Sequence, residues 1–506
     1  MENIFSMSIK KVKKSEKNEQ NLKEKTAHAI VWSFVDKFGQ QALSIAIGII
    51  LARYFLSPSE YGLIALIFIF HALGWALIDS GFSNALIRKQ DVTQTDLSSV
   101  FYFNISLGVL VYFVLFFCAP AIASFYDKPI LTHLIRVMLL NIPLCSLLLI
   151  QTTIFSKSVN FKPLARTNLI ALFCSGFLTI FLAWKGLGVW VLVIQPLTGT
   201  SIKIICLWSI SSWKPAMVYS KQSIKNLWKY SSNLLASSVL NIVFQNIYAM
   251  LIGKIQPLEI VGYYNQAYKY SDIPFATVIP AIQTAVFPAM AKIGDDEERL
   301  KHAFRKTVRV SSFVYFPVML GLIAIAEPMI QTLLGVKWLP VVFYMKWFCL
   351  GYIFLGMASI YANILFIKGL SATLLRFNIF YRLLQLLGIV FTIRFGIIAL
   401  VISWVIASVL YAFLMIFYAG KKIHYSLPEQ VNDIFPYLTL ALLMCAGVFS
   451  LSYLINNYVI LLLTQLTAGM LLYLGLSYLL GSKVFHEVVG IVQNKMNNTI
   501  FAPLIR

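Results

Sequence analysis

The feature that most constrains this chain is a series of apolar runs, each about twenty residues long, that recurs from residue 27 to residue 481. A helix of that length matches the roughly 30 Å hydrocarbon core of a bilayer. Charged residues make up 12% of the 506 residues, about half the share that is usual in soluble globular proteins. The sequence therefore predicts an all-α polytopic membrane protein.

The runs divide into fourteen predicted spans joined by short connections. The spans lie near 28–51, 61–80, 98–120, 132–155, 165–183, 187–208, 228–252, 260–291, 308–334, 341–367, 372–392, 396–419, 435–455 and 459–481. The longest connections, near 209–227 and 292–307, are too short to fold as separate domains. The chain has no G-x-x-x-x-G-K-[ST] and no H-E-x-x-H sequence, so neither an ATP-binding P-loop nor a zinc protease motif is present. We expect no catalytic residue, no metal site and no cofactor.

The net charge of +21 follows the predicted topology. With the N-terminus in the cytoplasm, 29 Lys and Arg lie in cytoplasmic segments and six in the opposite connections. This is a strong positive-inside bias, and it places both termini in the cytoplasm. Basic segments of this kind also attract anionic lipid headgroups, so the charge does not indicate a nucleic-acid partner.

Two stretches about 200 residues apart resemble each other. The first, ILARYFLSPSEYGLIAL, contains Arg53, Pro58, Glu60 and Gly62; the second, MLIGKIQPLEIVGYYNQAY, contains Lys254, Pro257, Glu259 and Gly262. Six spans separate the two stretches, and six spans preserve orientation in the membrane. Parallel repeats of this kind occur in alternating-access transporters.

Polar residues form stripes on several predicted spans. They are Ser33, Lys37, Gln40 and Ser44 beside Asp36 and Gln41; His71, Trp75 and Asp79; Asn233, Ser237, Asn241, Gln245 and Tyr248; and Asn265, Lys269 and Asp272 beside Tyr263, Tyr264 and Tyr268. A charge at the bilayer centre costs roughly 2.5–3.5 kcal/mol on insertion scales, so it normally faces protein or water. The stripes predict a hydrated cavity. Structural interpretations stay open: an Asp36–Lys37 ion pair, a core His71, amides that join helices, snorkelling Arg53 and Lys254, and an aromatic belt at the tyrosines.

The stretches DKFGQQALSIAIGIILARYFLSPSEYGLIAL and GYYNQAYKYSDIPFATVIPAIQTAVFPAMAKIGDDEERL resemble the Wzx/WzxC-type lipopolysaccharide and exopolysaccharide exporters of the multidrug/oligosaccharidyl-lipid/polysaccharide flippase superfamily. The resemblance implies two six-helix lobes in a V around a central cavity, with two further helices. The implied segments are a basic cytoplasmic tail (1–26), an N-lobe (27–208), a cytoplasmic linker (209–227), a C-lobe (228–420), spans 13 and 14 (421–481) and a cytoplasmic tail (482–506).

The resemblance also implies the cargo, an undecaprenyl-diphosphate-linked oligosaccharide moved across the bacterial inner membrane. A diphosphate requires cationic donors, for which the candidates are Lys37, Lys269, Lys346, Arg376 and Arg382. Amides and aromatic faces suit sugars, and the candidates are Gln40, Gln41, Asn241, Gln245, Tyr264 and Tyr268. Expected partners are the polyprenyl-linked glycan, membrane lipids and a polymerase or export machinery.

Without an ATPase, transport must be driven by H⁺, Na⁺ or the membrane potential, and Asp36, Asp79 and Asp272 are the carboxylates that could bind a coupling ion. Two other functions stay open. One is a multidrug or lipid II exporter of the same superfamily; a drug exporter should have an apolar cavity with carboxylates and fewer cations. A polysaccharide polymerase should have a large periplasmic loop, which this sequence lacks.

Overall fold

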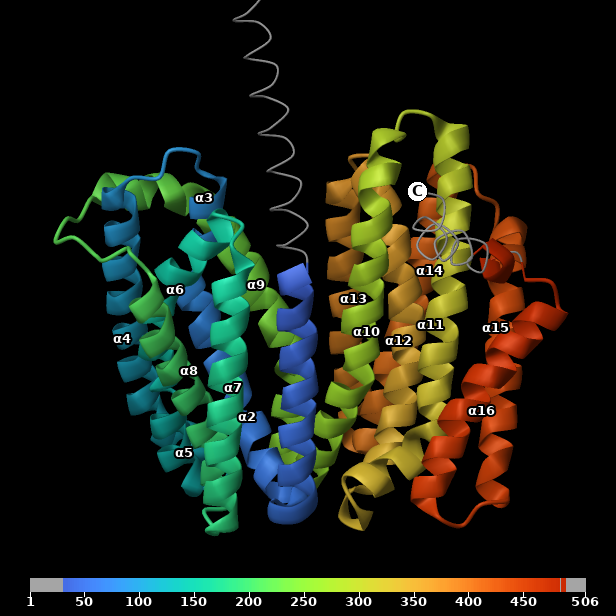
Figure 1. Ribbon diagram of the computed structural model, residues 1–506, viewed down its shortest axis with the longest axis horizontal. Helices are drawn as coiled ribbons and strands as arrows, with labels where there is room; N and C mark the ends of the chain where they lie inside the picture. The colour runs from blue at the N-terminus through green and yellow to red at the C-terminus, as the bar shows by residue number, and fades with distance from the viewer. Residues whose placement is uncertain (1–30, 483, 488–506) are drawn as a thin grey trace, which may run out of the picture. The chain divides into compact units, whose positions relative to one another are not determined.

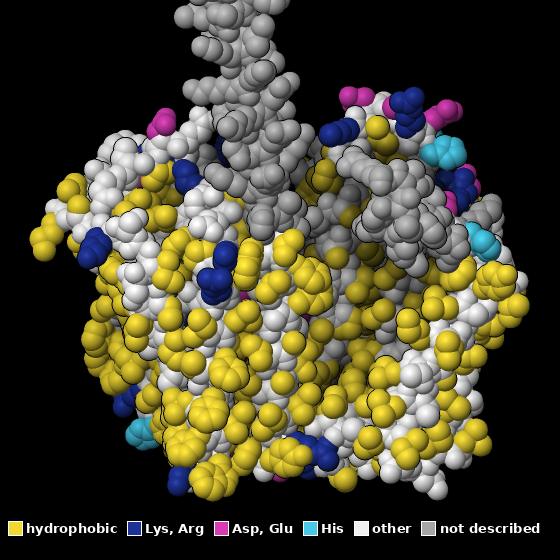
Figure 2. Space-filling view, in the orientation of Figure 1, with side chains coloured by type: hydrophobic (Ala, Val, Ile, Leu, Met, Phe, Trp, Pro, Cys, Tyr) yellow, Lys and Arg dark blue, Asp and Glu magenta, His cyan; other side chains and the backbone are white. Residues whose placement is uncertain are grey.

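The protein is built from long helices. The computed structural model describes residues 31–482 and 484–487, and no strand occurs among them. Fourteen helices in this part of the chain are long and apolar enough to cross a membrane, which confirms the predicted fold class. On the face shown in Figure 2, hydrophobic side chains form a broad band, and most Lys and Arg lie towards its upper and lower edges. The chain is a multi-pass membrane protein.

The chain divides into two compact units, Met1–Gly262 and Tyr263–Arg506, and Figure 1 labels most of the helices. The first unit contains the first span Val31–Phe55, α2 (Pro58–Asp79), α3 (Phe82–Arg88), α4 (Gln94–Phe125), α5 (Ile130–Met138), α6 (Asn141–Lys157), α7 (Phe161–Trp184), α8 (Trp190–Ile210) and α9 (Lys221–Ile255). Helix α10 (Leu258–Lys292) begins in the first unit and continues into the second. The second unit then contains α11 (Glu297–Leu333), α12 (Pro340–Ile367), α13 (Ser371–Thr392), α14 (Ile397–Lys422), α15 (Leu427–Ser450) and α16 (Tyr458–Leu479).

Several helices begin earlier than the hydropathy predicts, among them α9 and α11. Helix α9 begins at Lys221, inside the predicted linker, and α11 begins at Glu297, inside the predicted connection. Each start is capped: the Ser220 hydroxyl accepts from the Ser223 amide at 3.2 Å, and the Asp296 carboxylate accepts from the Arg299 amide at 3.1 Å. Such caps satisfy amides that a helix start leaves unpaired, so both helices extend beyond their apolar segments.

The first span packs on α7 through two glycines. A Cβ at Gly39 would lie 2.8 Å from a methyl group of Leu169, and a Cβ at Gly176 would lie 2.2 Å from the end of Ile47. Small residues let membrane helices approach closely. The first span and α7 therefore share a long contact surface, on which the polar groups described below lie.

The two repeated stretches meet each other at the starts of α2 and α10. A Cβ at Gly62 would lie 2.0 Å from the carbonyl oxygen of Leu258, and a Cβ at Gly262 would lie 2.0 Å from the carbonyl oxygen of Pro58. Each glycine is the fifth residue of its helix, and each faces the first residue of the other helix. This reciprocal contact, which lies within the first unit, pairs the two halves of the predicted repeat.

Two prolines inside helices are compensated by side chains from neighbouring helices. A proline has no amide hydrogen, so it leaves the carbonyl four residues earlier without its helical partner. In α11, Pro317 cannot donate to the Phe313 carbonyl, and this carbonyl accepts instead from the Tyr473 hydroxyl of α16 at 2.8 Å. In α4, Pro120 cannot donate to the Phe116 carbonyl, and this carbonyl accepts instead from Nε of Arg136 of α5 at a long 3.4 Å. Tyr473 therefore fixes α16 on α11.

We expect a Tyr473→Phe substitution to destabilise the protein by about 1–2 kcal/mol, because the Phe313 carbonyl is left buried without a donor. In a Pro317→Ala background the new amide can bond that carbonyl, so the same substitution should cost less than about 0.5 kcal/mol. Chemical denaturation in mixed micelles measures both differences, with the exposed Tyr478, changed to Phe, as control. An equal cost of Tyr473→Phe in both backgrounds contradicts the compensation.

Candidate functional site

The first polar cluster surrounds Asp36 on the first span. Its carboxylate accepts from Nε2 of Gln40 at 2.7 Å, and from Nδ2 of Asn168 on α7 at 3.1 and 3.2 Å. Asp36, Gln40 and Asn168 are all half-buried. The structure thus brings together two of the predicted site residues with an asparagine that the sequence analysis did not select. A carboxylate held by two amides is positioned to bind a cation or a proton.

A lysine lies deeper in the same unit. The half-buried Lys203 of α8 interacts electrostatically with Asp36 and with Cys145 of α6. An ammonium group within a span is costly unless a charge or water compensates it. The sequence analysis overlooked Lys203, although a lysine inside a predicted span is itself a signal of a functional site.

A tryptophan flanked by two cations lies one helical turn before Asp36. Nζ of Lys162 lies 5.6 Å from the centre of the Trp32 ring, and Cζ of Arg166 lies 5.7 Å from it. Both cations belong to the first turns of α7, at positions i and i+4. The sequence analysis counted them only as topological charges.

The other predicted residues of the first unit lie apart from this cluster. Lys37 and Gln41 are exposed on the first span, as are Asn241 and Gln245 on α9. Asp79 ends α2 and accepts from the Ser83 hydroxyl at 2.6 Å, so it joins α2 to α3. Lys37 and Asp36 are neighbours in sequence, but the hydrogen bonds of Asp36 go to amides.

A second cluster in the second unit joins α10, α12 and α13. Tyr268 and Asp272 of α10 lie within electrostatic range of Tyr352, and Tyr268 also of Arg382. The Tyr352 side chain is buried, with 2% of the residue exposed, and it interacts with both Tyr268 and Asp272. Arg382 donates to Oε1 of Gln385 at 3.1 Å. Tyr268, Asp272 and Arg382, all selected from the sequence, therefore lie in one cluster.

The remaining candidates of the second unit lie elsewhere. Lys269 and Arg376 are exposed. Lys346 is half-buried, with Nζ 5.8 Å from the ring centre of Phe449 on α15. The proposed sugar contact of Tyr264 is not supported, because the residue is 5% exposed and packs edge-on against Phe348. Its helix position buries it between α10 and α12.

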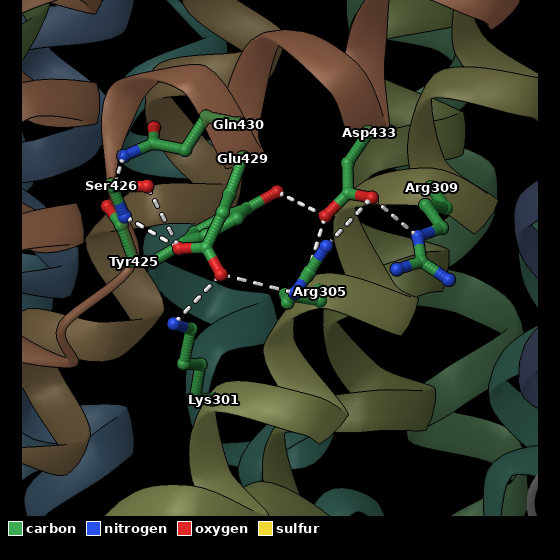
Figure 3. A network of polar contacts seen from close by, with 8 residues as sticks. All are labelled: Lys301, Arg305, Arg309, Tyr425, Ser426, Glu429, Gln430 and Asp433. Carbon is green, nitrogen blue, oxygen red and sulfur yellow. Dashed lines mark hydrogen bonds and ion pairs between the residues drawn. The ribbon is translucent and has the colours of Figure 1, made fainter.

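The strongest ionic network joins α11 to α15 (Figure 3). Asp433 accepts from Nε of Arg305 at 2.7 Å, from Nε of Arg309 at 2.8 Å and from the Tyr425 hydroxyl at 2.8 Å. Glu429 accepts from Lys301 at 2.9 Å and from Arg305 at 3.2 Å. Burial raises the pKa of Tyr425, so its hydroxyl stays protonated and donates. These carboxylates are fully engaged, and the network is a structural clamp.

An apolar groove of about 310 Å³ lies between helices of the second unit. It is lined by Pro274 of α10, by Pro317, Val318, Gly321, Leu322 and Ile325 of α11, by Met444 and Val448 of α15, and by Gln465, Leu466, Gly469 and Met470 of α16. Gln465 donates to the Val448 carbonyl at 3.0 Å, while its Oε1 is buried and lacks a partner among the described residues. Apart from Gln465, the residues that line the groove are apolar or glycine.

The fold is that of a polytopic helical membrane protein, and it is similar to the folds of two solved structures. The structure of the lipid II flippase MurJ in an inward closed conformation aligns with a TM-score of 0.73 at 17% identity, covering 94% of this chain and all of MurJ. An inward-facing multidrug resistance MATE transporter of the MOP superfamily aligns with a TM-score of 0.61 at 15% identity, covering 78% of this chain and 98% of that one.

The sequence places the chain in a family. The model of the polysaccharide biosynthesis protein family matches residues 50–343, so the chain belongs to that family, and the resemblance found in the sequence is confirmed. The succinoglycan biosynthesis transport protein ExoT of Rhizobium meliloti is 27% identical over 61% of this chain and 62% of its own length. The teichuronic acid biosynthesis protein TuaB of Bacillus subtilis is 28% identical over 53% and 56%. The lipopolysaccharide biosynthesis protein WzxC of Escherichia coli is 23% identical over 73% and 75%. The chain thus spans less than two thirds of the length of ExoT and of TuaB.

Proposed function

We propose that the protein is a flippase that moves polyprenyl-diphosphate-linked oligosaccharide repeat units across the bacterial cytoplasmic membrane by alternating access. The observation that carries this proposal is the family match over residues 50–343 of a chain with fourteen membrane-spanning helices. The relatives named above act in succinoglycan, teichuronic acid and lipopolysaccharide biosynthesis. The cargo would serve lipopolysaccharide or exopolysaccharide biosynthesis.

The charges of the clusters suit an anionic headgroup. In the first unit, Lys203 lies inside a span, and Lys162 and Arg166 lie in the first turns of α7. In the second unit, Arg382 lies within electrostatic range of Tyr268. Cations of this kind form charge-assisted hydrogen bonds with phosphate oxygens. Lys37 and Lys269 stay candidates for the same task, because both are exposed on their helices.

The apolar groove suits the other half of the cargo. A polyprenyl tail is as apolar as the bilayer, so it gains little from entering protein unless the groove fits it closely. Gly321 and Gly469 carry no side chain and leave room along the groove, and Gln465 is the one polar residue among those that line it. An apolar groove suits a lipid-linked cargo better than a free oligosaccharide, which is polar throughout.

Asp36 is the carboxylate that we propose for ion coupling with H⁺ or Na⁺, because Gln40 and Asn168 hold it in place inside the first unit. An Asp36→Asn variant should lose dependence of transport on the ion gradient while keeping its fold, since the amide fits the same space. Flipping assays in proteoliposomes with and without imposed H⁺ and Na⁺ gradients measure this. Unchanged gradient dependence in Asp36→Asn would remove Asp36 from the mechanism.

Deletion of the gene tests the function itself. We expect loss of the surface glycan and accumulation of polyprenyl-linked repeat units on the cytoplasmic side, restored by the wild-type chain. Lys37→Ala and Lys203→Met should fail to restore export, whereas Lys185→Met, at the other end of α7, should restore it. Repeat units that reach the outer leaflet but do not polymerise indicate a polymerase. An intact glycan with new drug sensitivity indicates a multidrug exporter.

A further inference from the structure

The beginning of α7 carries a pair of cations beside an aromatic ring. Lys162 and Arg166 are both exposed, and both lie within 6 Å of the centre of the half-buried Trp32 ring. Positions i and i+4 share one face of a helix, so the two positive charges repel each other. Within residues 31–482 and 484–487, no ion pair joins either of them to a carboxylate.

The nearest carboxylate along the first span is already engaged. Asp36 lies one helical turn after Trp32, about 6 Å along the axis, and it accepts from Gln40 and Asn168. Trp32, Lys162 and Arg166 therefore form a surface that presents two cations and an aromatic face, and we call it the Trp32 surface. An anion that bound there would relieve the repulsion between the two cations.

The chemistry of the Trp32 surface selects a particular kind of anion. Phosphate oxygens accept charge-assisted hydrogen bonds from ammonium and guanidinium groups. The face of an indole ring is electron-rich, and the polarised C–H groups on one face of a sugar ring pack well against it. A glycosyl phosphate carries both groups on adjacent atoms, whereas inorganic phosphate carries only the first.

We propose that the Trp32 surface is a docking subsite for the glycosyl-phosphate part of the cargo headgroup. Trp32 stacks on the sugar next to the phosphate, and Lys162 and Arg166 hold the phosphate oxygens. This inference rests on the proposed function, to which it adds an initial binding step for the headgroup. A headgroup docked here lies one helical turn from Asp36, so docking precedes any contact with the inner cluster of Asp36 and Lys203.

The other end of α7 supplies a matched control. Nζ of Lys185 lies 4.8 Å from the ring centre of Trp184 and 5.7 Å from that of Phe181. This end has the same cation–aromatic chemistry on the same helix, but only one cation. If binding requires two cations beside one ring, substitutions at the Trp32 surface should weaken it and substitutions at the Trp184 end should not.

The test is calorimetric titration of the full chain in phosphatidylcholine nanodiscs. The probes are inorganic phosphate, methyl glucoside, and the 1-phosphates of glucose, galactose and N-acetylglucosamine. We expect at least one sugar phosphate to bind more tightly than inorganic phosphate. Replacing both cations (Lys162→Gln with Arg166→Gln) should weaken binding of all phosphates by about tenfold or more. Trp32→Leu should abolish the preference for the sugar phosphate, and Lys185→Gln and Trp184→Leu should change neither quantity.

Three results would overturn the inference. The first is equal phosphate binding by the wild type and the double cation variant. The second is that none of the sugar phosphates binds more tightly than inorganic phosphate. The third is that phosphatidylglycerol in the nanodiscs blocks phosphate binding completely, both in the wild type and in Trp32→Leu. That result would mark a general site for anionic lipids. Lys162→Arg with Arg166→Lys keeps both charges and should retain binding, which controls for misfolding. The proposed function fails separately, if deletion leaves surface glycan and lipid-linked intermediates unchanged.

Discussion

A Gly62→Ala substitution is expected to lower the stability of the purified protein by about 3 kcal/mol or more, for the addition of a single methyl group. Overpacking of a core usually costs about 1–3 kcal/mol, because neighbouring side chains can move. Here the added Cβ would lie 2.0 Å from the carbonyl oxygen of Leu258 and 3.3 Å from the amide nitrogen of Gly262. These are backbone atoms, so only a separation of α2 from α10 can relieve the clash.

Gly262→Ala should have a similar effect, since its Cβ would meet the carbonyl oxygen of Pro58 at 2.0 Å. The double variant should cost clearly less than the sum of the two, because one separation of the helices relieves both clashes. Gly48→Ala is the control: nothing lies within 4 Å of a Cβ there, and alanine favours a helix by about 1 kcal/mol over glycine. Denaturation in mixed micelles measures these differences. Additive costs at Gly62 and Gly262 would contradict a shared contact.

The spans were predictable because bilayer thickness fixes the length of an apolar helix. The helix starts at Lys221 and Glu297 were not, because hydropathy ends where polar caps continue the helix. Asp296, Glu297 and Glu298 are the kind of residues that begin helices, and weighing them would have placed the start of α11 correctly. The repeat was visible in the sequence, but the reciprocal contact of Gly62 with the start of α10 was not.

The site was predictable only in part. Asp36 and Gln40 are four residues apart, so helical spacing alone makes them neighbours, and a hydrogen bond joins them. Asn168 is 132 residues away from Asp36, and only the packing of α7 on the first span brings it there. Lys203 was detectable, because it is a charge inside a span. Tyr264 was selected for its residue type, which does not reveal that its ring faces α12.

The network on α11 was hidden for another reason. Arg305 and Arg309 follow Lys301 at intervals of four, and Glu429 and Asp433 have the same spacing. Two helices with complementary charges at matching intervals can pair along one side. In the sequence, the same cations agree equally well with the positive-inside rule, so a topological interpretation concealed a structural one. The second unit uses them for both purposes.

An Asp433→Ala substitution is expected to be the most damaging change in that network. It removes the acceptor of Arg305, Arg309 and Tyr425 together, and leaves two guanidinium groups facing each other (Figure 3). Loss of one member of a buried ion pair costs about 3–5 kcal/mol. Asp433 has 7% of its side chain exposed, but the arginines have 24% and 30% exposed. Water therefore compensates part of the loss, and we expect about 3 kcal/mol.

The matched control is the ion pair between Lys306 and Glu487, which has a short contact of 2.5 Å but side chains 63% and 50% exposed. Glu487→Ala should cost less than about 0.5 kcal/mol, because surface pairs contribute little. Denaturation in mixed micelles at 0.1 and 1 M NaCl separates the two cases. High salt should remove most of any effect at Glu487 and little of the effect at Asp433, because exposed charges are screened and buried ones are not. Equal screening at both positions would mean that Asp433 interacts as an exposed charge, which contradicts a buried ionic clamp between α11 and α15.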